Sequence, residues 1–281
     1  MLSRRDFLAV SALAGVAPRA SAQAGGERWK IGMYQGMLRV SEPEVFELAK
    51  RIGLDGVELL MGTPKESLPL RRAEVRQRYK EASRRSGLAI SSVCINALNQ
   101  VPLKSEPKTA LWLLDTIEAC RDFGCQNILV PFFGRGELKM EAAEEIERVV
   151  DVLKELGPRA AQAGVTLGLE NTLSADDNLA LLERIGSPAV RVYYDAGNSF
   201  GRGRDVPAEI RKLGRERICQ FHIKDNPSLL GQGKMDIPAV AAAIGDINAR
   251  GWLVLETVSP SGDVEKDTRA NLAYLKKVFG I

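Results

Sequence analysis

Short apolar segments and longer amphipathic segments alternate along this chain eight times, at intervals of about thirty residues. Short apolar runs bounded by turn residues predict buried strands, and longer segments with a 3.6-residue period predict helices. Strands that are apolar along their whole length are typical of parallel sheets covered by helices. The expected strands are residues 29–35, 56–60, 88–95, 127–133, 165–170, 190–195, 218–223 and 252–257.

A helix signal follows each expected strand. The stretch from Ser41 to Glu44 combines an N-cap residue, an early proline and acids, and predicts a helix that ends at Gly53. The remaining helices are expected at residues 74–86, 108–123, 140–163, 175–185, 207–213, 236–249 and 266–278, with 140–163 interrupted near Gly157 and Pro158.

Eight strand–helix units in one domain predict an α/β fold, a single (β/α)8 or TIM barrel. A doubly wound open sheet would also alternate strands and helices. That fold commonly carries a glycine-rich phosphate fingerprint after its first strand, and Gly32 and Gly36 are too isolated to form one. The length of 281 residues and the 45% apolar content suffice for one large core.

Four of the expected strands end in a side chain that can ligate a metal ion. These residues are Glu170, Asp195, His222 and Glu256, at the ends of strands five to eight. A lone acid or histidine at the end of a buried strand costs free energy unless a partner stabilises its charge. In a barrel the C-terminal strand ends gather on one face, which is where functional residues lie. We therefore expect the four side chains to share one divalent ion.

Each of these residues alone has another explanation, because an acid after a strand can cap the next helix or pair with an arginine. That explanation is poor for four consecutive strands, and His222 is the only histidine in the chain. Carboxylates combined with one imidazole suit Mn²⁺, Co²⁺ or Mg²⁺, and Zn²⁺ also accepts them. A site with few protein ligands leaves room for a substrate.

The charge balance argues against a nucleic-acid partner. Thirty-nine basic and thirty-six acidic residues leave a net charge of +3. The basic residues are scattered along expected helices, where charges at helical spacing usually face water. A small-molecule ligand is therefore the expected partner, and a homo-oligomer is compatible with the sequence.

Residues 1–22 are expected to be a twin-arginine signal peptide rather than part of the fold. Residues 3–8 read SRRDFL, residues 8–17 are apolar, and residues 20–22 read ASA, a small-residue cleavage pattern. The apolar run is too short to span a bilayer, and no other stretch is long and apolar enough. We expect a barrel of residues 23–281, periplasmic or secreted and not stably inserted in a membrane. An uncleaved anchor or a disordered tail is the alternative.

The four cysteines, Cys94, Cys120, Cys125 and Cys219, show neither a C-x-x-C pair nor zinc-finger spacing. Their positions in apolar segments predict small buried residues. An oxidising compartment would permit a bridge between Cys120 and Cys125.

The strand ends resemble those of the xylose isomerase-like TIM barrels, in the sugar phosphate isomerase/epimerase superfamily. The resemblance covers the mature chain, and its specific part is four segments that read LEN, YDAGN, FHIKD and LET around the four ligand candidates. It implies that Glu170, Asp195, His222 and Glu256 bind the metal. It also implies that Glu170 and Glu256 are the catalytic pair, each moving a proton on one face of the substrate.

The sequence departs from the family pattern at positions that are expected to contact the substrate. Asn198 stands where many relatives have a histidine, and Ser228 lies near the position of an arginine that contacts substrate in the epimerases. Lys224 follows His222 by two residues, so both side chains should point to the inside of the barrel. Lys224 could therefore bind a substrate oxygen or act as an acid/base. Its alternative role is an ion pair with Glu256 or Asp225. Three further candidates for the pocket wall end strands two to four: Glu58, Asn96 and Phe132.

The expected activity is isomerisation or epimerisation of a small non-phosphorylated sugar, keto-sugar or polyol through an enediolate. A phosphate is normally held by a helix N-terminus or by arginine, and no arginine lies between His222 and Ile247. A lyase acting on 3-keto-glycosides would begin with the same proton abstraction and is the main alternative. A sugar-binding barrel without turnover would be favoured if one of the four ligand positions were lost, but all four are present. An apurinic endonuclease-like hydrolase would need more histidines than one.

Overall fold

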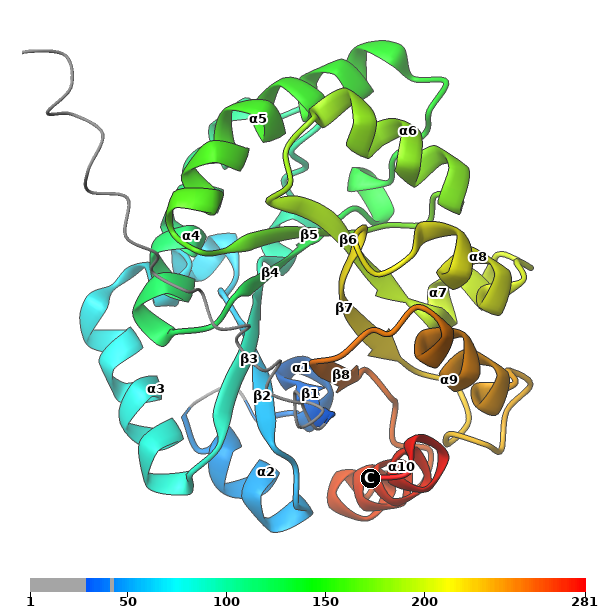
Figure 1. Cartoon of the computed structure of the whole chain (residues 1–281). Coiled ribbons are helices and arrows are strands. Elements are labelled where there is room, and N and C mark those ends of the chain that lie inside the picture. Colours follow the sequence, from blue (N-terminus) through cyan, green and yellow to red (C-terminus); the bar gives the residue numbers. More distant parts are fainter. Residues whose placement is uncertain (1–28, 41–42) are drawn as a thin grey trace, which may run out of the picture.

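The eight strands of this computed structural model, which describes residues 29–40 and 43–281, are all parallel and close into one barrel in sequence order. Figure 1 shows the ring of helices around the strands. The predicted (β/α)8 fold is confirmed. The strands are β1 (Lys30–Tyr34), β2 (Gly56–Leu60), β3 (Ala89–Cys94), β4 (Asn127–Pro131), β5 (Thr166–Glu170), β6 (Val190–Asp195), β7 (Ile218–Ile223) and β8 (Trp252–Leu255).

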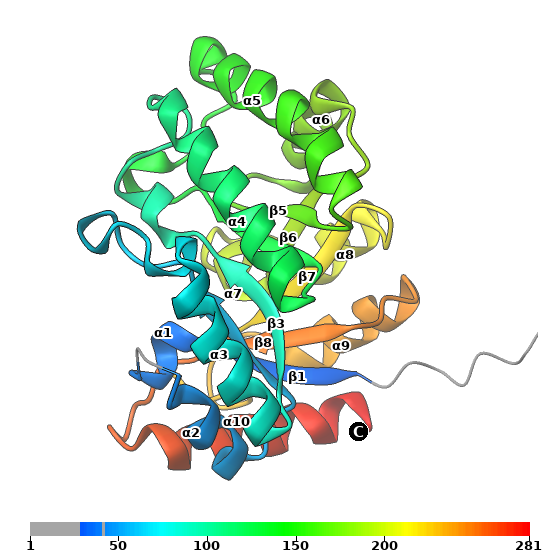
Figure 2. The ribbon, with the colours of Figure 1, turned by 90° about the vertical axis from the view of Figure 1, so that its left-hand side faces the viewer.

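The helices lie outside the barrel and cover its apolar outer face, as the second view also shows (Figure 2). They are α1 (Gln35–Leu38), α2 (Val45–Ile52), α3 (Ala73–Ser86), α4 (Ala110–Phe123), α5 (Ala143–Gln162), α6 (Ala175–Ile185), α7 (Ala196–Gly201), α8 (Val206–Leu213), α9 (Ile237–Asp246) and α10 (Val264–Phe279). The major core fills the layer between these helices and the strands.

The helices of the second half begin with side-chain caps. Ser174, Asp205, Asp236 and Asp263 each accept a hydrogen bond from a backbone N–H three residues later, at the starts of α6, α8, α9 and α10. Asp195 does the same for α7. Each such cap stabilises a helix start by about 1 kcal/mol. Because these starts lie on the face where the strands end, capping fixes the loops around that face.

Two helical features differ from the sequence expectation. The interruption predicted near Gly157 and Pro158 is wrong, because α5 continues through both residues. A Cβ at Gly157 would lie 2.4 Å from the Oγ of Ser187, so the glycine lets α5 approach that loop closely. The short helices α1 and α7 were not predicted, and α7 starts directly at the Asp195 cap.

The interior of the barrel contains a small apolar cluster of Cys94, Leu129 and Tyr193, next to polar side chains that belong to the site described below. All four cysteines lie within the described residues and are free, so the permitted bridge between Cys120 and Cys125 is absent. No helix within the described ranges is long and apolar enough to cross a membrane. The predicted signal peptide, residues 1–22, lies outside the described residues.

Candidate metal centre

The four predicted ligands meet at the C-terminal end of the barrel. Glu170 and Asp195 are the last residues of β5 and β6, His222 is the last but one of β7, and Glu256 follows β8. The ladder between β6 and β7 pairs Asp195 with His222 directly. One ligand atom from each of the four side chains lies within 4.8 Å of all the others. The sequence pattern thus placed the four residues correctly on one face.

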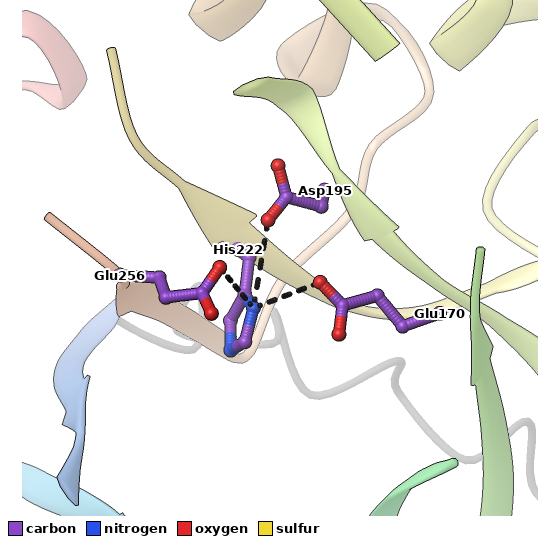
Figure 3. Close-up of side chains that lie close together, drawn as sticks. All are labelled: Glu170, Asp195, His222 and Glu256. Atoms are coloured by element: carbon purple, nitrogen blue, oxygen red, sulfur yellow. Dashed lines mark hydrogen bonds and ion pairs between the residues drawn. The ribbon is translucent and has the colours of Figure 1, made fainter. Parts of the chain in front are cut away.

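The three carboxylates surround one nitrogen of the imidazole, as Figure 3 shows. The Nδ1 of His222 lies 3.3 Å from Glu170 Oε1, 3.4 Å from Glu256 Oε2 and 3.6 Å from Asp195 Oδ2. Glu170, Asp195 and His222 are at most 5% exposed, whereas the side chain of Glu256 is 18% exposed. The site therefore opens on the Glu256 side.

This donor set fits a divalent cation. Two ligands of one ion lie at most about 4.2 Å apart when each metal–ligand bond is about 2.1 Å, so only small movements would bring these atoms to one ion. Among the described residues Asp195 Oδ2 has no hydrogen-bond donor of good geometry, although Lys224 Nζ lies 2.8 Å away. A buried carboxylate oxygen with an unused lone pair is the acceptor that a cation would satisfy.

Electrostatics at the site reflect three carboxylates in a small buried volume. Burial raises the pKa of Glu170 to about 8, although His222 acts in the opposite direction. Burial also acts to raise the pKa of Asp195, but Lys224 and His222 outweigh it and hold this pKa well below its usual range. For His222 burial acts to lower the pKa, and the surrounding Tyr193 and carboxylates raise it well above normal. The surrounding negative charge thus favours the protonated form of His222.

Lys224 takes part in the cluster through two ion pairs. Its Nζ contacts Asp195 Oδ2 at 2.8 Å and also Glu256 Oε2. The expected ion pair between Lys224 and Glu256 is present. The second acid that pairs with Lys224 is Asp195 and not Asp225. Burial disfavours the ammonium, yet these acids raise the pKa of Lys224. A Cβ at Gly197 would lie 2.4 Å from the Cγ of Lys224, so the glycine makes room for the lysine stem.

Asn198 also reaches the ligand set. Its Nδ2 donates to Glu170 Oε1 over 3.3 Å, and its backbone N–H donates to Asp195 Oδ1 over 2.7 Å. Asp195 therefore both caps α7 through Oδ1 and directs Oδ2 to the site. Substrate contacts by Asn198 and Lys224 stay predictions.

Two of the expected pocket-wall residues lie elsewhere. Glu58 is the central residue of β2 and fully buried, with Oε1 2.9 Å from His222 Nε2, so it supports the imidazole from below. Phe132 is 1% exposed and lies in the main core, because it follows β4 with its ring between sheet and helices. Neither offers surface to a substrate. A strand-end position alone does not fix the direction of a side chain, and substrate contacts by Glu58 and Phe132 stay predictions.

Asn96 lies after β3, at the start of a short 3₁₀ turn (Asn96–Asn99). It lines a cavity of about 350 Å³, together with Gln35, Leu60 and Tyr79. Its Oδ1 is buried without a hydrogen-bond partner among the described residues. A sugar hydroxyl would satisfy this acceptor, so the predicted substrate contact of Asn96 stays a prediction.

The sequence reading missed three residues beneath the site. Ser92 Oγ and Tyr193 OH each donate to Glu58 Oε2 over 2.6 Å, and Gln220 Nε2 donates to both hydroxyl oxygens. The sequence could have indicated two of them. Tyr193 and Gln220 precede Asp195 and His222 by two residues, and side chains two residues apart on a strand point to the same side of the sheet.

Comparisons with known proteins identify the family of this chain. A family model described as xylose isomerase-like TIM barrel matches residues 46–278. A 2-epi-5-epi-valiolone 7-phosphate 2-epimerase of Actinoplanes sp. is 27% identical over 226 residues, which cover 76% of this chain and 82% of that protein. A putative L-ribulose-5-phosphate 3-epimerase of Escherichia coli is 28% identical over 255 residues, covering 81% and 88%.

Solved structures of low sequence identity share the fold. A D-psicose 3-epimerase, crystallised in the presence of D-fructose, superposes with a TM-score of 0.76 at 17% identity, covering 90% of this chain and 100% of the other. A 3-keto-D-glucoside 4-epimerase of E. coli gives 0.74 at 20% identity, covering 89% and 100%. The family match spans most of the described barrel, including all four ligand positions. The chain belongs to the xylose isomerase-like TIM barrel family.

Proposed function

We propose that this protein is a divalent-metal-dependent epimerase or isomerase of a small non-phosphorylated sugar, keto-sugar or polyol. The observation that carries the proposal is the position of Glu170 and Glu256. Their carboxylates approach the His222 nitrogen from opposite sides, at 3.3 and 3.4 Å (Figure 3). A substrate carbon between two such carboxylates can lose a proton to one and gain a proton from the other.

The roles of the residues follow from their placement. Glu170, Asp195, His222 and Glu256 would hold the cation, which when bound polarises a carbonyl and its neighbouring hydroxyl and so acidifies the α-carbon proton. Glu170, on the buried side, and Glu256, on the open side, would exchange protons with the two faces of an enediolate. Lys224 Nζ, beside Glu256, is placed to donate to a substrate oxygen.

The absence of phosphate from the substrate is supported by the helix starts on this face. The N-terminus of α10, the usual phosphate site after strand eight, is capped by Asp263. The N–H of Ser261 in the preceding loop donates to Asp267 Oδ2 over 2.9 Å. The two sequence relatives are named for phosphorylated substrates and point the other way, so this part of the proposal needs its own test.

A lyase acting on 3-keto-glycosides is a second candidate. Its first step is the same proton abstraction, and the resulting enediolate then expels a β-leaving group instead of regaining the proton. The ammonium of Lys224 next to Glu256 favours this reading, because it could protonate a departing oxygen on the open side.

The test is a screen of free and 3-keto sugars against the Mn²⁺-loaded protein in D₂O. Solvent deuterium entering a carbon-bound position establishes enolisation, and the product distinguishes an epimer or isomer from a released aglycone. If no sugar in the screen exchanges a carbon-bound hydrogen, the proposal of enolisation fails.

We further propose export through the twin-arginine route, on the basis of residues 3–22. Replacement of both arginines by lysine, Arg4→Lys and Arg5→Lys, should retain the protein in the cytoplasm of a bacterial host. Immunoblots of periplasmic and cytoplasmic fractions measure the distribution, and an unchanged distribution argues against this route.

A further inference from the structure

Glu58 is a buried carboxylate that none of the proposed reaction steps uses. It is fully buried in the middle of β2, and its Oε1 lies 2.9 Å from the Nε2 of His222. The other ring nitrogen, Nδ1, faces the carboxylates of the metal centre. Because one ring nitrogen of a neutral imidazole carries the proton and the other the lone pair, the partner of Nε2 decides which nitrogen can bind a metal.

The hydrogen bonds around Glu58 have fixed directions. Gln220 Oε1 accepts from Asn127 Nδ2 at 2.7 Å, so Gln220 Nε2 is the donor to Ser92 Oγ at 2.9 Å and to Tyr193 OH at 2.7 Å. Each hydroxyl oxygen thus accepts a hydrogen and directs its own hydrogen to Glu58 Oε2, at 2.6 Å in both cases. An oxygen that accepts two hydroxyl donors carries no proton itself.

The remaining oxygen, Oε1, faces the imidazole and accepts from it when the Glu58 carboxylate is ionised. Oε1 is buried, and the donor that the described residues offer to it is His222 Nε2. A buried carboxylate without this donor would leave an acceptor unpaired at a large free-energy cost. With an ionised Glu58, the network would hold the neutral ring with its hydrogen on Nε2 and its lone pair on Nδ1, toward Glu170 and Glu256.

The strand ladders contain two irregularities at this network. The β2–β3 register shifts immediately before Glu58 and pairs it with Ser92, and the β6–β7 register shifts immediately before Tyr193 and pairs it with Gln220. An extra residue in one strand redirects the side chains that follow, and such bulges occur next to active sites. Both shifts bring network members opposite one another.

We propose that Glu58 is a positioning residue that holds His222 in the Nε2–H tautomer and orients Nδ1 as a metal ligand. Ser92, Tyr193 and Gln220 keep the Glu58 carboxylate in place. A carboxylate that accepts from a ligating histidine fixes the ring and raises the basicity of the ligand. The inference rests on the metal site of the proposed function and not on the reaction or its substrate.

The first experiment measures metal affinity in the full-length protein. Competition between the protein and a chromophoric chelator for Mn²⁺ gives the dissociation constant of wild type, Glu58→Gln and Tyr193→Phe. Loss of the outer partner should weaken Mn²⁺ binding by about 10- to 100-fold in Glu58→Gln. Tyr193→Phe keeps the Glu58 carboxylate and removes one of the hydroxyl groups that donate to it. The loss of Mn²⁺ affinity should therefore be smaller in this variant than in Glu58→Gln.

Asp55→Asn is the matched control. It removes one carboxylate just before β2, at the opposite end of that strand, where Asp55 Oδ2 accepts from the backbone N–H of Ile31 at 2.8 Å. It is remote from His222, so Mn²⁺ affinity should equal that of wild type. Equal weakening in Asp55→Asn and Glu58→Gln would show a general effect of β2 on the fold and overturn the proposal.

The second experiment uses the fact that His222 is the only histidine. Nitrogen-15 NMR of the Zn²⁺-loaded protein reports one imidazole, so its tautomer can be assigned without mutagenesis of other histidines. We expect wild type to show a slowly exchanging Nε2–H and a metal-shifted Nδ1, and Glu58→Gln to show faster exchange of that hydrogen.

Three results would overturn the proposal. In the first, Glu58→Gln keeps wild-type Mn²⁺ affinity and an unchanged imidazole spectrum. In the second, Asp55→Asn and Glu58→Gln weaken Mn²⁺ binding equally, which would show a general effect of β2 on the fold. In the third, Glu58→Gln fails to fold by circular dichroism, and Tyr193→Phe, which folds, shows neither weaker binding nor faster exchange. Failure of every sugar to turn over would leave both measurements intact, because neither uses a substrate.

Discussion

The two halves of the barrel differ in what their strands carry and in how their helices begin. Strands β5 to β8 end in or next to the four candidate ligands, whereas β1 to β4 end in Tyr34, Leu60, Cys94 and Pro131. Helices α6 to α10 all begin at a side-chain cap, and within the described residues α2 to α5 begin without one. Local rigidity is thus concentrated where the ligands lie.

The two halves of the barrel contribute side chains to different levels of the candidate metal site. The first half supplies Glu58 and Ser92 beneath His222, where they are fully buried. The second half supplies the ligands themselves and the loops around them. Substitutions in the second half should therefore change activity, and those in the apolar part of the first half should change stability.

The largest expected effect is the loss of metal from the second half. Chelation, or the variant His222→Ala, should abolish turnover, because the three acids would then be left without a common cation. Mn²⁺ or Co²⁺ should restore activity to the chelated wild type but not to His222→Ala. Elemental analysis and turnover assays measure both, and full activity in excess chelator would contradict the metal centre.

Next in size is the effect of neutralising the catalytic pair. Glu170→Gln and Glu256→Gln each keep an oxygen for the metal and lose the base, so turnover should fall by at least about 100-fold, the usual scale for a general base. Metal content, measured in parallel, should be partly retained. Near-normal rates in both variants would show that another residue acts as the base, and Lys224 would be the first candidate.

The metal-free protein should lose stability as pH rises. The folded state holds the Glu170 proton with a pKa of about 8, above its ordinary 4.5. The stability that this proton contributes is complete below pH 4.5 and is lost as pH rises through 8. His222 acts in the same direction, because its pKa is also raised.

Thermal unfolding of the metal-free protein between pH 5 and 8 measures this effect. Metal ligands must be deprotonated, so bound metal should raise the melting temperature more at pH 8 than at pH 5. Glu170→Gln should flatten the slope of the metal-free protein. A metal-free wild type that becomes more stable over this range would contradict the sign.

A smaller difference separates a neutral keto-sugar from its phosphate ester. We expect no preference for the ester, because the helix starts around the site are already capped. The comparison is of kcat/KM for the two compounds. A preference for the ester of about 10-fold or more, equivalent to about 1.4 kcal/mol of transition-state binding, would show that the phosphorylated substrates of the sequence relatives also apply here.

The smallest effect on turnover is expected in the first half. Phe132→Leu shrinks a fully buried ring and should destabilise the fold by about 1–3 kcal/mol. Turnover per folded molecule and Mn²⁺ affinity should remain at wild-type values. Denaturant unfolding measures the stability change, and an altered KM would return Phe132 to the pocket wall.

The sequence predicted the fold and the meeting of the four candidate ligands, because both depend on local pattern. Alternation and apolar runs place Glu170, Asp195 and His222 at strand ends, and parallel topology then gathers those ends without further information. The bounds of β6 and β7 agree with the expectation to the residue.

Contacts between distant strands were beyond such reasoning. Glu58 and His222 are 164 residues apart, and their pairing depends on β2 and β7 facing each other across the barrel interior. The register shift that aligns Glu58 with Ser92 cannot be detected from residue propensities. The role of Gly157 likewise depends on a loop, around Ser187, that the helix meets only after folding.

Because the four candidate ligands come from four consecutive strands, an ion bound by them would also act as a cross-link within the chain. It joins segments from Glu170 to Glu256, so opening any one of β5 to β8 requires breaking a metal bond. Binding only to the folded state shifts the opening equilibrium by mass action. Amide hydrogens of β5 to β8 should therefore exchange more slowly in the loaded protein, whereas those at the starts of β1 to β4 should follow global unfolding in both forms. One cofactor would in this way set two separate exchange regimes within a single closed sheet.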